Sequence, residues 1–129
     1  MKKFGGLILM ILISLSLFGL TACDKNISYE QITAQEAKVI MDTERDYIII
    51  DARTEEEFAD GHIKGAVLIP EYEIAEKAEV ELTDKNALIL VYCRSGRRSK
   101  IASEELVKLG YTNVKEFGGI IDWPYETVK

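Results

Sequence analysis

A lone cysteine followed by three arginines is the part of this sequence best suited to chemistry. Cys93 ends an apolar run, and the six residues after it are Arg94, Ser95, Gly96, Arg97, Arg98 and Ser99. Free cysteine titrates near ~8.5, and nearby cations or a helix N-terminus lower that value, so this segment favours the nucleophilic thiolate. Backbone N–H groups and arginines also bind oxyanions, which would bring the nucleophile and an anionic substrate together.

The N-terminal segment is predicted to be a targeting signal. Two lysines precede the apolar residues 4–20, and the sequence then reads LTAC, ending at Cys23. The run is short for a spanning helix, which needs about 20 residues, and the pattern is typical of a secretory signal. LTAC resembles the lipobox of bacterial lipoproteins. That resemblance implies a signal peptide over residues 1–22, then a lipidated cysteine and a short tether over residues 23–28.

An uncleaved membrane anchor is the alternative for this segment. Both interpretations put the remaining residues outside the cytoplasm, attached to the cell membrane; the lipoprotein is favoured because Cys23 stands where the apolar run stops. A lipid on Cys23 leaves Cys93 without a disulfide partner in the chain. Since an unpaired thiol is a liability in an oxidising compartment, Cys93 is either buried and inert or present for its reactivity, and the arginines favour reactivity.

The segments around Cys93 predict a single α/β domain with a mostly parallel central sheet flanked by helices. Strands are expected at residues 47–51, 66–69, 87–92 and 113–117, with the most apolar run, 87–92, at the centre. Helices are expected at residues 33–41, 54–61, 71–80 and 99–109. Ligands of such sheets bind beyond the carboxyl ends of the strands, and Cys93 stands at that end of the central strand.

Composition excludes several classes of function. The chain has 129 residues, enough for one domain, and a net charge of −6 with no basic stripe that interleaves aromatics, so nucleic-acid binding is not expected. One histidine and no spare cysteine provide too few soft ligands for a metal site.

Three motifs, in order along the chain, resemble single-domain rhodaneses, which are sulfurtransferases. The stretch IIIDARTEEEFADGHIKGAVLIP resembles the family's aspartate-x-arginine and glycine-histidine-isoleucine segments, VYCRSGRRS its active loop, and FGGIIDWP its glycine-glycine and tryptophan pattern. The resemblance implies a rhodanese-like domain over residues 29–126 and a tail over residues 127–129.

The resemblance also implies a chemistry. The Cys93 thiolate would take the outer sulfur of an anionic donor such as thiosulfate, forming a persulfide cradled by the N–H groups of residues 94–99. A thiophilic acceptor, cyanide or a thiol, would then remove that sulfur, with no metal or organic cofactor. Arg98 is expected to contact the donor, whereas Arg94 and Arg97 are either substrate contacts or solvated.

The other motif residues are expected to support the fold. Asp51 and Arg53 are predicted to form an ion pair that fixes a strand end, and Glu57 to cap the helix that begins after Thr54. His62 is predicted to belong to a structural turn rather than to act as a general base. The Gly118–Gly119 pair is predicted to form a turn near the loop.

Two other functions are carried as alternatives: a non-catalytic binding module of the same fold, and a cysteine phosphatase or arsenate reductase. Phosphatases of the cysteine type place an arginine after a cysteine and five residues, but here that position is Ser99, and Arg98 comes one place early. The six-residue loop, with Ser99 expected to open the helix, predicts a small cradle sized for one sulfur. Thiol–disulfide oxidoreduction is disfavoured because no second cysteine stands near Cys93.

Overall fold

Five strands, all paired in parallel, form one sheet in the order β1-β5-β4-β2-β3. The computed structural model describes residues 28–129, so the predicted signal peptide and lipidated Cys23 lie outside the described residues. The strands are β1 (Glu30–Gln31), β2 (Ile48–Asp51), β3 (Val67–Leu68), β4 (Ile89–Cys93) and β5 (Val114–Gly119). The predicted α/β fold is confirmed, and the apolar run before Cys93 is the central strand, as expected.

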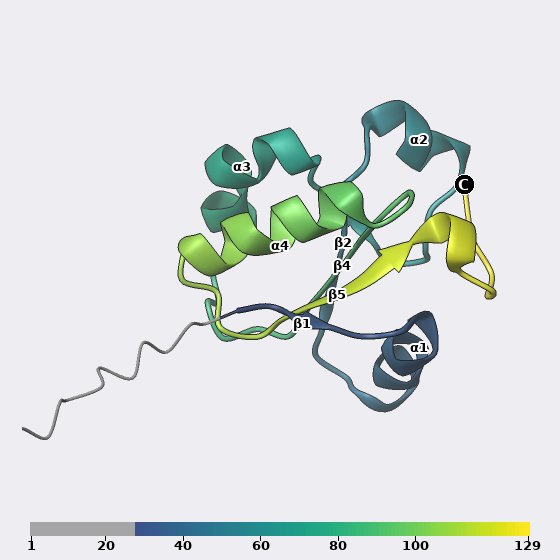
Figure 1. Ribbon diagram of the computed structural model, residues 1–129, viewed down its shortest axis with the longest axis horizontal. Helices are drawn as coiled ribbons and strands as arrows, with labels where there is room; N and C mark the ends of the chain where they lie inside the picture. The colour runs from purple at the N-terminus through teal and green to yellow at the C-terminus, as the bar shows by residue number, and fades with distance from the viewer. Residues whose placement is uncertain (1–27) are drawn as a thin grey trace, which may run out of the picture.

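The helices cover both faces of this sheet (Figure 1). They are α1 (Ala34–Thr43), α2 (Glu55–Asp60), α3 (Ile74–Glu81) and α4 (Arg97–Lys108), with short 3₁₀ turns η1 (Glu71–Glu73) and η2 (Ile120–Asp122). Helix α1 lies on one face, and α3 and α4 lie on the other (Figure 1). None of the helices in residues 28–129 is long and apolar enough to cross a membrane.

Strand β4 sends alternate side chains into two separate cores, as the pleat of a strand requires. Ile89, Val91 and Cys93 belong to the cluster on the α3 and α4 side. Leu90 and Tyr92 belong to the cluster on the α1 side, and all five residues are buried. The alternation therefore turns Cys93 toward α4 at the carboxyl end of the central strand.

Two boundaries differ from the sequence predictions. Helix α4 begins at Arg97 rather than at Ser99, because Gly96 adopts a φ of 107° as its N-cap and closes the turn early. The tail predicted after residue 126 is part of the domain. Val128 pairs with His62 through two backbone hydrogen bonds of 2.8 Å, so the chain end lies beside the segment that follows α2 (Figure 1).

Candidate active site

The thiol of Cys93 lies under a tight three-residue turn. Cys93 is 1% exposed, and the N–H of Gly96 donates to its Sγ at 3.0 Å. An N–H directed at sulfur favours the negatively charged form of that sulfur. Arg94 and Ser95, which complete the turn, are exposed, so the buried sulfur has only a short loop between it and solvent.

Helix α4 begins directly after this turn and adds to its positive character. The N–H groups of the first helical residues have no partner within the helix, and the aligned peptide dipoles put partial positive charge at this end. Arg97, in the first turn, is exposed, and neither it nor Arg94 forms an ion pair with any residue in 28–129. Both arginines therefore present their charge to solvent at the mouth of the turn.

The end of β5 holds the loop from the other side. A Cβ placed on Gly119 would lie 2.0 Å from the carbonyl oxygen of Arg94, so only glycine fits there. The same carbonyl accepts the N–H of Ile121 at 3.2 Å. Gly118 and Gly119 lie near the loop, as predicted, but they end a strand that pairs with Cys93 rather than forming a turn.

Arg98, expected to contact the donor, has a partner within the protein instead. Its guanidinium nitrogens donate to both carboxylate oxygens of Glu57, at 2.6 and 2.9 Å. These hydrogen bonds lower the pKa of Glu57 to about 2. Glu57 also forms the predicted capping box with Thr54. A direct contact between Arg98 and substrate stays a prediction.

The predicted ion pair of Asp51 and Arg53 is confirmed. The Arg53 Nη2 lies 2.8 Å from Asp51 Oδ2, and the two residues are 5% and 0% exposed. The Tyr92 hydroxyl donates to the same carboxylate at 2.7 Å, and burial together with the Asp51 charge raises the pKa of Tyr92. This network joins the carboxyl ends of β2 and β4, and so fixes the strand end from which Cys93 projects.

His62 packs against α2 and pairs with the chain end, and its predicted structural role stays a prediction. Its ring stacks on Phe58 with centroids 3.7 Å apart, and its Nδ1 lies 2.8 Å from the carbonyl oxygen of Phe58. The backbone of His62 pairs with Val128, which holds the chain end in place.

One buried residue of the site was missed in the sequence analysis. Glu116 of β5 is 2% exposed, and its Oε1 accepts the Ser99 hydroxyl at 2.6 Å and the Gly118 N–H at 2.8 Å. The thiol of Cys93 in turn donates to Ser99 Oγ at 3.3 Å. Alternation along β5 was the available signal, since Glu116 stands two residues after Val114 and therefore on the same face of the sheet.

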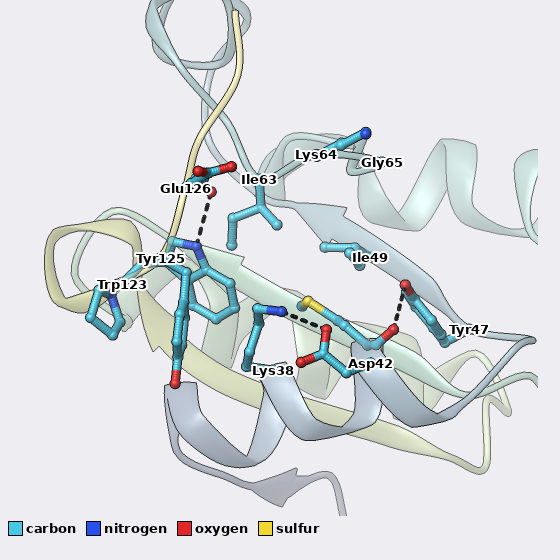
Figure 2. Close-up of a pocket in the computed structure, with 12 residues that line it drawn as sticks. Lys38, Asp42, Tyr47, Ile49, Ile63, Lys64, Gly65, Trp123, Tyr125 and Glu126 are labelled. Atoms are coloured by element: carbon cyan, nitrogen blue, oxygen red, sulfur yellow. Dashed lines mark hydrogen bonds and ion pairs between the residues drawn. The ribbon is translucent and has the colours of Figure 1, made fainter.

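A separate groove lies on the opposite side of the sheet (Figure 2). Its apolar floor includes Ile49, Ile63 and Trp123, all members of the core cluster on the α1 side, and its rim carries Lys38 and Glu126. No residue of the 93–99 loop lines it. The groove is therefore distinct from the surroundings of Cys93, which belongs to the other core.

Comparison with known proteins places this arrangement in a family. The chain matches the family described as "Rhodanese-like domain" over residues 33–124. The thiosulfate sulfurtransferase PspE of Escherichia coli (strain K12) is 40% identical over 80 residues, covering 62% of this chain and 77% of PspE. A sulfurtransferase of Allochromatium vinosum is 38% identical over 85 residues, covering 65% of this chain and 77% of that protein.

Solved structures agree with the sequence relatives. A structure described as "rhodanese with anions from E. coli" superposes with a TM-score of 0.61 at 38% identity, covering 64% of this chain and 98% of that one. A rhodanese-related protein of Thermoplasma volcanium gives a TM-score of 0.67 at 30% identity, covering 78% and 98%. Sequence, fold and the cysteine loop thus lead to one assignment, and the chain belongs to the rhodanese-like domain family.

Proposed function

We propose that this chain is a sulfurtransferase that moves sulfane sulfur from an anionic donor such as thiosulfate to a thiophilic acceptor, cyanide or a thiol. The observation that carries the proposal is the buried Cys93 sulfur, which receives the Gly96 N–H at 3.0 Å beside the start of α4. The names of the relatives, a thiosulfate sulfurtransferase and a sulfurtransferase, support the same chemistry.

The first half-reaction loads sulfur onto Cys93. Its thiolate attacks the outer sulfur of thiosulfate, a new S–S bond forms, and the S–S bond of thiosulfate breaks so that its electron pair leaves with sulfite. The product carries a negative charge on the outer sulfur of the persulfide. Preorganised N–H groups of the turn and of the start of α4 would stabilise that charge without having to reorient.

The second half-reaction returns Cys93 to its starting state. Cyanide or a thiolate attacks the outer sulfur, the Cys93 S–S bond breaks, and its electron pair returns to the Cys93 sulfur. The exposed Arg94 and Arg97 would attract the anionic donor, whereas the charge of Arg98 is balanced by the Glu57 carboxylate. The Cys93 charge contributes to raising the pKa of Arg98, although the hydrogen bonds to Glu57 contribute more.

A side-by-side assay separates this proposal from the two alternatives. The purified protein and Cys93→Ser are given thiosulfate with cyanide in one assay and p-nitrophenyl phosphate in the other. Cys93-dependent formation of thiocyanate with negligible phosphate release is expected. Cys93-dependent phosphate release without thiocyanate would favour the phosphatase, and activity in neither assay would favour the binding module.

The proposed cellular location rests on the N-terminal sequence alone. LTAC, with Cys23 at the end of a short apolar run, supports a bacterial lipoprotein that is cleaved before Cys23 and anchored to the cell membrane by a lipid on its sulfur. In this proposal the rhodanese-like domain works outside the cytoplasm.

A further inference from the structure

Glu116 is a buried carboxylate that the sulfur-transfer steps above leave unused. Its Oε1 accepts two hydrogen bonds, from the Ser99 hydroxyl and from the Gly118 N–H. Among residues 28–129 it forms no ion pair with a lysine or arginine. The site therefore holds a buried carboxylate that has no salt-bridge partner in residues 28–129, next to the hydroxyl that contacts the reactive sulfur.

The hydroxyl of Ser99 connects this charge to Cys93. Ser99 has a single proton, and its contact with Glu116 at 2.6 Å is shorter than those with the Gly96 carbonyl at 3.0 Å and Cys93 Sγ at 3.3 Å. The proton therefore lies on the Glu116 side, and Ser99 presents a lone pair to the sulfur. A lone pair accepts the S–H of the resting thiol but gives no hydrogen bond to a thiolate.

The Ser99 oxygen also determines where transferred sulfur can go. It fills the side of the Cys93 sulfur nearest Glu116, so an added sulfur atom has to extend away from the carboxylate, about 2 Å further out. In the thiolate the negative charge is on Sγ, whereas in the persulfide it is on the outer sulfur. Repulsion by Glu116 is therefore stronger for the thiolate than for the persulfide.

We propose that Glu116 is a positioning residue for sulfur transfer: acting through Ser99, its buried carboxylate biases Cys93 toward the sulfur-loaded state. The inference rests on the proposed persulfide chemistry. When thiosulfate loads Cys93, one S–S bond forms, one breaks, and the negative charge moves from Sγ to the outer sulfur, away from Glu116. When an acceptor removes the sulfur, the charge must return, so Glu116 holds the sulfur on Cys93 until an acceptor attacks.

Other charged groups face the same sulfur and carboxylate. Arg98 of α4 interacts electrostatically with Cys93, and it is paired with Glu57 of α2. Tyr29, which precedes β1, interacts electrostatically with Glu104 of α4 and with Glu116. A Glu116→Gln variant leaves all of these in place and keeps an acceptor oxygen for Ser99 and Gly118, so it removes the charge alone.

The test compares the wild type with Glu116→Gln and with the exposed control Glu81→Gln, all in a Cys23→Ala background so that Cys93 is the only thiol. Each protein is equilibrated with a fixed ratio of thiosulfate to sulfite at the same alkaline pH, and the persulfide fraction is read by intact mass. The ratio of persulfide to free thiolate should fall about threefold in Glu116→Gln. It should not change in the control.

A second readout separates charge from fold. At a fixed neutral pH, iodoacetamide should alkylate Cys93 faster in Glu116→Gln than in the wild type, because the thiolate no longer faces a negative charge. Glu116→Asn, an amide one methylene shorter, should shift both readouts in the same direction, and thermal unfolding checks that each variant is folded.

The outcomes are distinguishable from failure of the proposed function. If the wild type takes up no sulfur, the sulfurtransferase proposal fails and this inference fails with it. If the wild type takes up sulfur but folded Glu116→Gln has the same or a higher persulfide ratio, the role of Glu116 is overturned and the sulfurtransferase proposal stands.

Discussion

The guanidinium of Arg98 contacts both carboxylate oxygens of Glu57, at 2.6 and 2.9 Å, and so joins the first turn of α4 to the first turn of α2. Glu57 closes the capping box of α2 with Thr54 at the same time. One carboxylate thus fixes the start of two helices, and the start of α4 is the segment that follows the Cys93 turn. The pair therefore ties the end of the Cys93 turn to α2.

In Glu57→Gln the free energy of unfolding should change less between pH 4.5 and pH 2 than it does in the wild type. Because Arg98 lowers the pKa of Glu57 from 4.5 to about 2, the ion pair contributes fully above the unfolded value and is lost as the pH falls from about 4.5 toward 2. At pH 7 the variant should lose about 1–2 kcal/mol of unfolding free energy, measured with urea. The difference from wild type should shrink at pH 2.

The control for that measurement is Glu55→Gln, an exposed glutamate in the same first turn of α2. Its free energy of unfolding should equal that of the wild type at every pH, apart from a few tenths of a kcal/mol from the helix dipole. A difference between Glu57→Gln and wild type that stays constant from pH 7 to pH 2 would show that Arg98 does not hold Glu57 ionised.

Asp51→Asn should be strongly destabilising, because it leaves the guanidinium of Arg53 buried without a counter-charge. We expect a loss of about 3 kcal/mol in urea unfolding. Tyr92→Phe, which removes one hydroxyl from the same network, should cost about 1–2 kcal/mol. A loss below 1 kcal/mol for Asp51→Asn would contradict the importance assigned to this network.

Gly119→Ala should reduce sulfur uptake at least about tenfold, since its Cβ would lie 2.0 Å from the Arg94 carbonyl and displace the turn that follows Cys93. Gly118→Ala is the matched control. It has open space around its Cβ but a φ of 88°, so it should cost about 1 kcal/mol of stability and keep its activity. Equal activity of the two variants would mean that the close approach does not position the loop.

Sequence patterns that depend on neighbouring residues predicted well. The continuous apolar run before Cys93 identified the central strand, and the Thr54–Glu57 spacing identified the start of α2, because both are local preferences. The Asp51–Arg53 pair followed from the recognised motif and was confirmed.

Long-range partners were less accessible to sequence analysis. Arg98 and Glu57 are 41 positions apart, and no residue near Arg98 in the sequence indicates that its guanidinium forms an ion pair. The pairing of Val128 with His62 depends in the same way on where the chain end lies in the fold. Helix α4 begins two residues before Ser99 because Gly96 adopts a positive φ. The backbone conformation of Gly96 could not be predicted from the sequence around Ser99.

Cys23→Ala should leave the precursor without lipid and uncleaved by lipoprotein signal peptidase. The wild-type protein should fractionate with membranes, and labelled fatty acid should be incorporated into it but not into the variant. If the variant were processed normally and still carried lipid, the lipoprotein interpretation would be wrong. Cys93→Ser, which keeps LTAC intact, is the control and should be lipidated like the wild type.

Cys93 is proposed to receive the sulfur atom, and the intact mass of the protein reports this transfer. The purified protein is incubated with thiosulfate and weighed before and after. The wild-type protein should gain the mass of one sulfur atom, and this gain should be absent in Cys93→Ser and reversed by cyanide. No gain from thiosulfate or from any other sulfane donor, in protein whose Cys93 is reduced, would contradict it.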